Sequence, residues 1–197
     1  MTKALRNWSL APILAAFLIG PSASSVSAAD VAGWTLDPAK SQLGFSGTQI
    51  GTKFAGKFNR YDTEIMFDPD HLDASHIAVT VDLGSVVTED TQRDTALPGK
   101  DWFDIAEFPQ ATFETTAIRK TGTSDYEAVG TLALRGVTKP LTLPFTLQID
   151  GPTAHVTGQV TLVRTDFGVG QGPWASDQWV AFEVDVNLDI LATRDDD

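Results

Sequence analysis

The residues best suited to metal or acid–base chemistry in this chain gather around one short acidic turn. Asp68, Asp70, His71 and Asp73 lie close together, and His76 follows shortly after them. Carboxylate and imidazole groups at such spacing can ligate a metal ion or activate a water molecule. However, Asp-Pro-Asp is first of all a turn former, because aspartate side chains accept hydrogen bonds from the nearby backbone. We therefore expect a turn here, and a hydrolase or metal enzyme is only the third functional hypothesis.

Other catalytic patterns in the sequence are weak. The stretch GVGQG at 168–172 has the look of a phosphate-binding loop, but Pro173 follows it and no helical pattern begins there. Glu183, Asp185 and Asp189 alternate with apolar residues, which is typical of the outer face of a strand. The chain has no cysteine, which excludes thiol catalysis, and no Gly-x-Ser-x-Gly motif. We expect a binding protein that has no catalytic residues, no metal and no catalytic cofactor.

Large aromatic side chains supply the stronger signal. From Arg93 to Phe113 the sequence lacks strand-like alternation, yet this stretch contains Trp102, Phe103 and Phe108. A connection rarely carries so much apolar surface unless it covers something, so we interpret it as a flap over the mouth of an apolar cavity. Such cavities use a few polar groups to orient a ligand, although an arginine–aspartate pair is also an ordinary structural brace. The predicted ligand-binding residues are Phe45, Phe54, Phe58, Arg93, Asp94, Trp102, Phe103, Phe108, Phe113, Phe145, Phe167, Trp174 and Phe182, with Arg164 and Asp166 as further polar candidates.

The elements that must position these residues are strands. Alternation of apolar and polar residues, typical of antiparallel strands with one wet face, recurs along the chain. It is clearest at 77–83, 141–149, 154–162 and 180–190, and weaker at 43–48, 54–58, 63–67, 111–117 and 126–134. The last of these predicted strands is the longest. Only 89–97, capped by Thr88, has a helical pattern, with a short turn expected at 101–105.

Eight or more antiparallel strands must close into a barrel or split into a sandwich. Long strands favour the barrel, as do Gly56, Gly130 and Gly158, which interrupt apolar faces where a barrel needs room or sharp coiling. About eight strands leave an interior just wide enough for side chains or for one slender ligand. A filled core without a cavity therefore stays open as the alternative.

Residues 1–28 have the pattern of a secretory signal peptide. Lys3 and Arg6 form a positive segment, an apolar run follows from Leu10 to Ile19, and small residues lead to Ala28. Because the run is too short to span a bilayer, we expect cleavage, no stable membrane insertion, and a single domain over 29–197 exported to the periplasm. The formal net charge is −12, and the domain without Lys3 and Arg6 is more acidic still, which argues against nucleic acid as a partner.

Several short motifs, taken in order, resemble those of the YceI-like family of exported, lipocalin-like barrels, from about Trp34 to Arg194. They are Arg93-Asp94 with Leu97, Asp101-Trp102-Phe103-Asp104, Phe108-Pro109 with Phe113, Gly130-Thr131-Leu132, Arg135-Gly136-Val137-Thr138-Lys139-Pro140, and Arg164-Thr165-Asp166-Phe167-Gly168. The chain departs from the family pattern at Lys40 and Ala96, where relatives usually have histidine, and at Trp102, where they have phenylalanine. These departures leave the identity of a head group open.

The resemblance implies an all-β, extended antiparallel lipocalin-like barrel of about eight strands with a short helical flap. It implies a long amphiphilic ligand, typically a polyisoprenoid or isoprenoid quinone and sometimes a fatty acid derivative, and a link with quinone or cytochrome b561-type electron transport or a stress response. The leading hypothesis is a periplasmic carrier of such a lipid. The alternative is a stress or interaction protein with a filled barrel and no lipid ligand. Homodimerisation stays open in either case.

Overall fold

The computed structural model describes residues 31–195, and strands dominate this part of the chain. The strands are β1 (Trp34–Leu36), β2 (Gln42–Gln49), β3 (Thr52–Phe58), β4 (Tyr61–Met66), β5 (His76–Asp82), β6 (Val86–Val87), β7 (Gln110–Lys120), β8 (Asp125–Leu134), β9 (Val137–Asp150), β10 (Thr153–Val163) and β11 (Glu183–Arg194). The helical elements are α1 (Thr91–Ala96), η1 (Leu83–Ser85), η2 (Arg164–Phe167) and η3 (Gly172–Trp174). Within residues 31–195, no helix has the length and apolar character needed to cross a bilayer. The predicted signal peptide lies outside the described residues.

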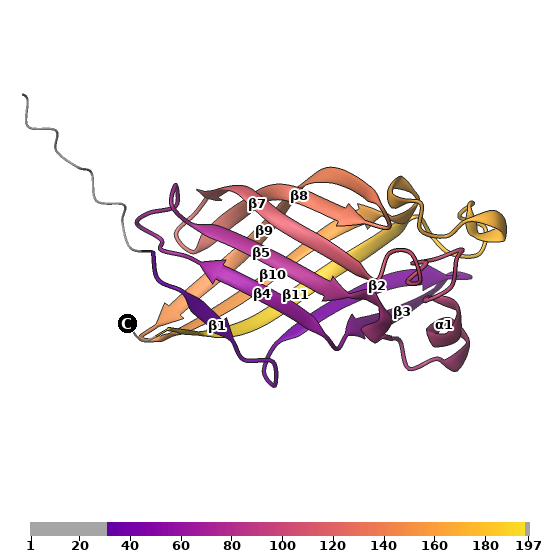
Figure 1. Ribbon diagram of the computed structural model, residues 1–197, viewed down its shortest axis with the longest axis horizontal. Coiled ribbons are helices and arrows are strands. Elements are labelled where there is room, and N and C mark those ends of the chain that lie inside the picture. Colours follow the sequence, from indigo (N-terminus) through magenta and orange to yellow (C-terminus); the bar gives the residue numbers. More distant parts are fainter. Residues whose placement is uncertain (1–30, 196–197) are drawn as a thin grey trace, which may run out of the picture.

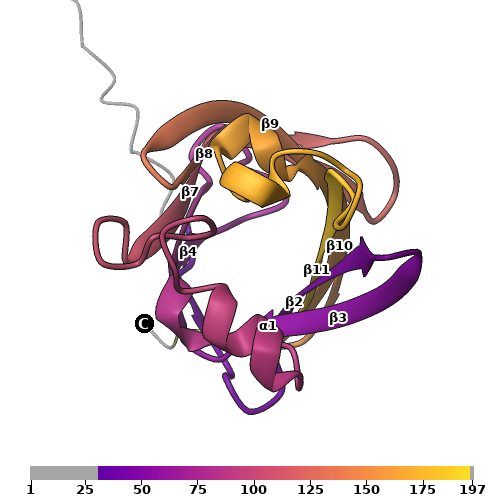
Figure 2. The same cartoon turned by 90° about the vertical axis from the view of Figure 1, so that its right-hand side faces the viewer.

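The strands form one antiparallel sheet that curls into a barrel (Figures 1 and 2). Its order is β4-β5-β7-β8-β9-β10-β11-β2-β3-β6, and β1 pairs with the far end of β11. Three pairs of strands each share one position in the wall: β1 with β2, β3 with β4, and β5 with β6. β1 and β2 both pair with β11, β3 pairs with β6, and β4 pairs with β5. The wall therefore has eight positions, and the predicted all-β barrel of about eight strands is confirmed.

The predicted crowding at glycines in the strands is present. A Cβ on Gly56 would collide with the ring of Phe45, and a Cβ on Gly130 would collide with the backbone carbonyl of Glu114. Gly130 faces the β-bulge of β7, where the wall bends. A bend of this kind brings neighbouring backbones too close for a side chain. These glycines therefore allow the sheet to coil tightly enough to close.

The helix begins later than predicted. α1 starts at Thr91, and its N-cap is Asp90, whose side chain accepts a hydrogen bond from the Arg93 N–H at 3.0 Å. The prediction that Thr88 caps the helix is wrong. The N–H and the hydroxyl of Thr88 both donate to Asp94, at 2.7 Å each, so Thr88 binds the helix through a side chain of its first turns and not through its end.

The final strand is shorter than predicted. Val180 makes only an isolated bridge with Gln49, and Phe182 lies in the connection before β11. β9 has 14 residues and β11 has 12, so the prediction that the last strand is the longest is wrong. The apolar alternation continued into a connection that covers the barrel end, which periodicity alone does not distinguish from a strand.

Candidate functional site

Inward-facing side chains leave two apolar cavities inside the barrel. The first has a volume of about 130 Å³ and the second about 220 Å³. Both linings include Leu43, Val79, Phe113, Leu143 and Leu188, so the cavities lie end to end. An apolar cavity of roughly 150 Å³ stays dry and binds small apolar molecules. The interior of this barrel is therefore suited to an elongated apolar group.

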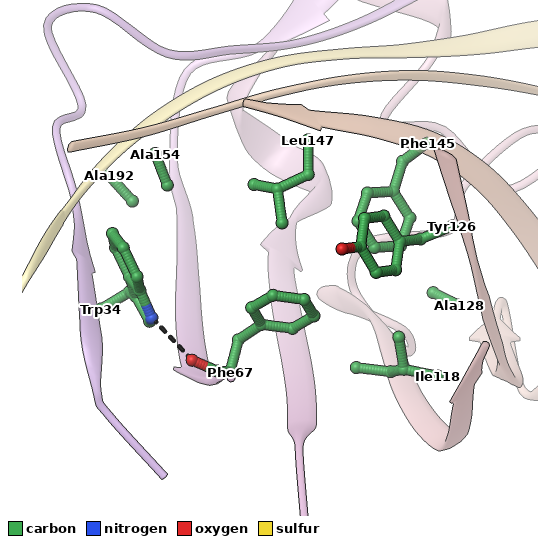
Figure 3. Packing of buried hydrophobic residues seen from close by; sticks show 9 residues of the cluster. All are labelled: Trp34, Phe67, Ile118, Tyr126, Ala128, Phe145, Leu147, Ala154 and Ala192. Atoms are coloured by element: carbon green, nitrogen blue, oxygen red, sulfur yellow. Dashed lines mark hydrogen bonds between the residues drawn. The ribbon is translucent and has the colours of Figure 1, made fainter. Parts of the chain in front are cut away.

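The first cavity ends against aromatic side chains that come from strands, and we call this the closed end (Figure 3). The Trp34 indole Nε1 donates to the Phe67 carbonyl at 2.9 Å. The Tyr126 ring stacks on Phe145 with a centroid distance of 5.4 Å and meets Phe67 edge-on at 5.8 Å. All four residues are buried, so three strands and the residue directly after β4 seal this end with their side chains.

The second cavity ends beneath irregular segments, and we call this the capped end. It consists of α1, the loop at 97–109 and the connection at 164–182, which lie opposite β1 (Figure 1). Phe103 is buried and packs on Phe58, with ring centroids 6.0 Å apart. The Trp102 ring contacts the Trp174 ring at 5.5 Å, which joins the loop to the connection.

Arg164 holds the capped end together. Its side chain is only 4% exposed. Nε donates to Ala181 O at 3.0 Å, Nη1 donates to Val169 O at 2.9 Å, and Nη2 donates to Ser176 O at 3.0 Å and Val180 O at 2.9 Å. Burial lowers the pKa of this guanidinium from its ordinary value. Because its donors are occupied by backbone carbonyls, Arg164 folds the 164–182 connection over the cavity.

The structure brings many of the predicted binding residues together around the cavities. Those that line the second cavity are Phe45, Phe54, Phe58, Trp102, Phe103, Phe113 and Phe167, and those that line the first are Phe113 and Phe145. Their positions on different strands and loops explain why they converge only in the closed barrel. Their binding role stays a prediction.

The other predicted binding residues lie outside the two cavity linings. They are Arg93, Asp94, Phe108, Trp174 and Phe182. The Arg93 guanidinium lies 4.6 Å from the centroid of the Phe54 ring and donates to Gln49 at 3.1 Å. Arg93 therefore braces α1 against the barrel wall.

The remaining three aromatic residues support the capped end from outside the lining. Trp174 contacts Trp102, as described above. The Phe182 ring lies 5.6 Å from the Arg164 guanidinium carbon. The Phe108 ring packs against Gly136, and it lies 2.7 Å from the position that a Cβ on Gly136 would take. These side chains seal the cover and do not face the cavities.

Sequence reasoning missed Tyr61, whose side chain lines the first cavity beside Thr63 and Ile65. The Tyr61 hydroxyl is buried and has no hydrogen-bond partner among residues 31–195. Burial raises the pKa of this phenol from its ordinary value. The weak alternation predicted at 63–67 would have reached Tyr61 had it been extended by one more inward position.

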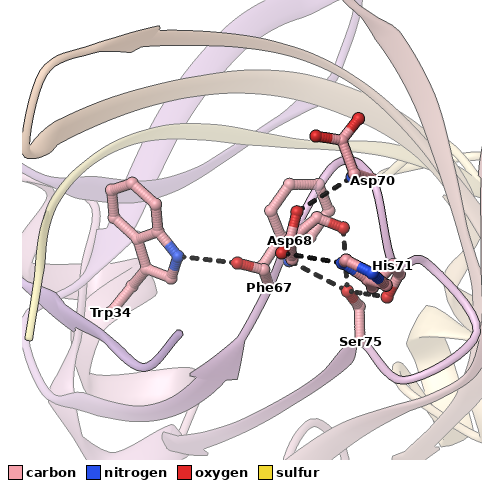
Figure 4. Close-up of polar contacts among 6 residues, drawn as sticks. All are labelled: Trp34, Phe67, Asp68, Asp70, His71 and Ser75. Atoms are coloured by element: carbon pink, nitrogen blue, oxygen red, sulfur yellow. Dashed lines mark hydrogen bonds and ion pairs between the residues drawn. The ribbon is translucent and has the colours of Figure 1, made fainter. Parts of the chain in front are cut away.

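The acidic turn behaves as a turn former, as predicted (Figure 4). Asp68 Oδ1 accepts from the Asp70 N–H at 2.9 Å, and Asp68 Oδ2 lies 3.0 Å from His71 Nδ1. The Asp70 N–H and His71 lower the pKa of Asp68, while the hydrogen bond to Asp68 raises the pKa of His71. His76 lies 3.9 Å from Glu114, away from this turn. Among residues 31–195, no group of three or more histidine, aspartate or glutamate side chains could hold a metal ion.

The sequence of this chain is similar to a known protein family and to several related bacterial proteins. The model of the YceI-like domain matches residues 34–192. A UPF0312 protein from Pseudomonas savastanoi pv. phaseolicola is 32% identical over 170 residues, which cover 81% of this chain and 88% of the relative. A UPF0312 protein from Yersinia pestis is 36% identical over 135 residues, which cover 68% of this chain and 59% of that relative.

Solved structures with the same fold include the crystal structure of Burkholderia cenocepacia BcnA. It is 32% identical to this chain, with a TM-score of 0.78, and the match covers 80% of this chain and 99% of BcnA. A polyisoprenoid binding domain from Saccharophagus degradans matches with a TM-score of 0.64 at 15% identity, over 82% of this chain and 98% of that domain. The second likeness concerns the fold alone. On the family match over residues 34–192 and the identity to its relatives, the chain belongs to the YceI-like family.

Proposed function

We propose that this protein is a periplasmic carrier that holds the tail of a long-chain amphiphile, a polyisoprenoid or an isoprenoid quinone, inside the barrel. The observation that carries this proposal is the pair of contiguous apolar cavities along the barrel interior. The similar domain from Saccharophagus degradans is described as polyisoprenoid-binding, which supports the same class of ligand.

The energetics favour a long apolar tail over a compact ligand. Burial of a methylene contributes about 0.8 kcal/mol, and this gain grows with tail length while part of the ordering cost is paid only once on association. The polar groups of the cavity linings are those of Tyr61, Thr63 and Arg164 and the indole N–H groups of Trp34 and Trp102. Because the donors of Arg164 are occupied by carbonyls, the interior supplies few polar contacts, which supports a binding role and not a catalytic one.

Mass spectrometry of an organic extract tests the proposal directly. The protein is purified from the periplasm beside a matched blank, and the extract is searched for polyisoprenoids and quinones. A stoichiometric isoprenoid supports the carrier function, and a quinone in particular would support a link with cytochrome b561-type electron transport. A lipid-free extract, together with no binding of added geranylgeraniol or ubiquinone, would favour the alternative stress or interaction protein.

Substitution of a shared lining residue provides a second test. Phe113 borders both cavities, whereas Asp185 lies on the outer face and accepts from the Thr161 hydroxyl at 2.6 Å. We expect Phe113→Ala to weaken tail binding by about tenfold or more, equivalent to about 1.4 kcal/mol, and Asp185→Ala to leave it unchanged. Equal effects of the two changes in a lipid titration would contradict the cavity model.

A further inference from the structure

The barrel wall is interrupted between β4 and the corner that joins β1 to β2. The pairing of β2 with β3 ends at Leu43 opposite Phe58. Near β1 the backbone pairs with the end of β4 through the bridge between Gly33 and Met66 and through the hydrogen bond from the Phe67 N–H to the Ala32 carbonyl at 3.0 Å. Between these points, no strand among residues 31–195 pairs with the edge of β4 that faces β1 and β2, although its other edge pairs with β5 along its whole length. Side chains alone close the wall here.

A polar groove of about 610 Å³ lies over this interruption, and we call it the side groove. Ser41 and Gln42 line it from one side of the gap, and Lys57, Arg60 and Asp62 line it from the other. Because these residues come from both sides of the interrupted wall, the side groove spans the gap, and it continues over the paired strands β5 and β7 at Thr80 and Gln110.

The side groove and the interior share residues. Phe58 lines the side groove and the second cavity, and Tyr61 lines the side groove and the first cavity. A single layer of residues therefore separates the outside of the barrel from both cavities at this point. Over most of the remaining described wall, backbone hydrogen bonding between neighbouring strands closes the barrel, although the pairing of β9 with β10 also ends, at Phe145 opposite Gly158.

The Tyr61 hydroxyl adds a chemical signal at the same place. A buried hydroxyl without a partner costs about 1–3 kcal/mol, and most buried polar groups avoid that cost. Tyr61 is such a group, as are the Trp102 indole N–H and Arg135 Nε near the capped end, and burial raises the pKa of the Tyr61 phenol. A ligand oxygen at this position would supply the missing hydrogen bond.

The charges around the side groove balance one another. Arg60 forms an ion pair with Asp82 at 2.8 Å, and Lys57 and Asp62 add one charge of each sign to the lining. This lining offers hydrogen bonds without a net field for an anion. It suits an uncharged head group, such as an alcohol or a quinone, better than a phosphate.

We propose that the side groove is the entrance through which the amphiphile reaches the interior, with its tail passing Phe58 and Tyr61 and its uncharged head held at the Tyr61 hydroxyl. This inference rests on the proposed function. It moves the entrance from the predicted flap to the side wall. The capped end, which Arg164 binds to several backbone carbonyls, then stays shut during loading.

Reversible blockage of the side groove tests the route. The chain has no cysteine, so Asp62→Cys in the side groove can be modified with a bulky thiol reagent that a reductant removes. Glu107→Cys, on the exposed loop of the capped end, is the matched control. The probe is a short-chain ubiquinone, whose arrival quenches the fluorescence of Trp34 and Trp102 in the cavity linings.

We expect the modified Asp62→Cys protein to bind and release the probe about tenfold or more slowly, with little change in affinity, because a block at an entrance affects both rates alike. The reductant should restore both rates. Slow kinetics in the modified Glu107→Cys protein instead would overturn the inference and return the entrance to the capped end. Absence of probe binding to the unmodified protein would refute the proposed function itself.

Removal of the Tyr61 hydroxyl tests the head-group contact. Tyr61→Phe retains the ring, so we expect the affinity for ubiquinone to fall by about tenfold, equivalent to about 1.4 kcal/mol, while the affinity for squalene, a hydrocarbon probe, stays unchanged. An equal loss for both probes would show that the substitution disturbs the cavity and that the hydroxyl makes no specific contact, and no loss for either would exclude the contact. Both of these outcomes contradict the proposed head-group site.

Discussion

The two ends of this barrel are closed by different means. At the closed end, Trp34 projects from β1, Phe67 from the segment directly after β4, and Tyr126 from β8. The Trp34 indole donates a hydrogen bond to the Phe67 carbonyl. At the capped end, long irregular segments cross the opening, and Arg164 binds the largest of them through backbone carbonyls. One end thus uses apolar packing on a regular scaffold, and the other uses a buried cation to order loops.

This difference explains where the barrel can have a cavity. Strand side chains at the closed end fill the interior, and the first cavity is the smaller at about 130 Å³ against about 220 Å³ for the second. Because Arg164 holds the loops of the capped end through their backbone carbonyls, the side chains of these loops need not fill the second cavity. A cover built on polar contacts to backbone therefore preserves more volume than a plug of aromatic rings.

The largest effect should follow from loss of the cation. Arg164→Met keeps apolar bulk but leaves several buried carbonyls without donors, and each unsatisfied group costs about 1–3 kcal/mol. We expect chemical denaturation to show a loss of more than about 3 kcal/mol in unfolding free energy. Arg119→Met, on the exposed face of β7, is the control and should change it by less than about 0.5 kcal/mol. Similar small losses for both variants would show that the capped end does not depend on Arg164.

The same difference separates what the sequence predicted from what it missed. Most of the closed end follows from alternation in the predicted strands at 63–67, 126–134 and 141–149, because each inward position in a strand is set by its pleat, whereas β1 with Trp34 was not predicted. The capped end does not follow from any period. Arg164 was a candidate for orienting a ligand or for an ordinary structural brace with an aspartate, and only the folded chain shows that its donors are taken by carbonyls that lie up to 17 positions away.

The candidate site was predicted in part for a similar reason. Aromatic residues on strand faces, such as Phe45 and Phe145, line the cavities because alternation fixes which way they point. Trp174 and Phe182 lie in connections, whose direction the sequence does not encode locally. The interrupted wall beside Tyr61 was not predictable, because it depends on which distant strands fail to pair.

A smaller loss should follow from removal of the indole hydrogen bond at the closed end. Trp34→Phe retains an aromatic ring but removes the donor to the Phe67 carbonyl, and such a bond contributes about 0.5–1.5 kcal/mol. We expect the free energy of unfolding to fall by about 1–2 kcal/mol, since the smaller ring also packs less well. Trp179→Phe is the control because this indole is 44% exposed. A loss at Trp34 as large as that at Arg164 would mean that the two ends depend equally on polar contacts.

The smallest effect concerns pH and should be confined to the closed end. His71 and Asp68 face each other at 3.0 Å on the surface turn that follows Phe67. The raised pKa of His71 stabilises the fold fully below about pH 6.5, and this contribution is lost as the pH rises through the raised value. The lowered pKa of Asp68 stabilises the fold above about pH 3.9, and this contribution is lost as the pH falls through the lowered value.

The stability difference between the wild type and His71→Gln should therefore be greatest between about pH 4 and 6.5 and should shrink on both sides of this interval. High salt should reduce it, because the pair is exposed and its attraction is screened. Thermal unfolding of both proteins across this range measures the difference. A difference that does not vary with pH would show that the pair does not form in solution. Arg164 itself adds no dependence in this interval, because it donates to carbonyls, which do not titrate, so a pH-dependent loss that persists in His71→Gln must come from other titratable groups.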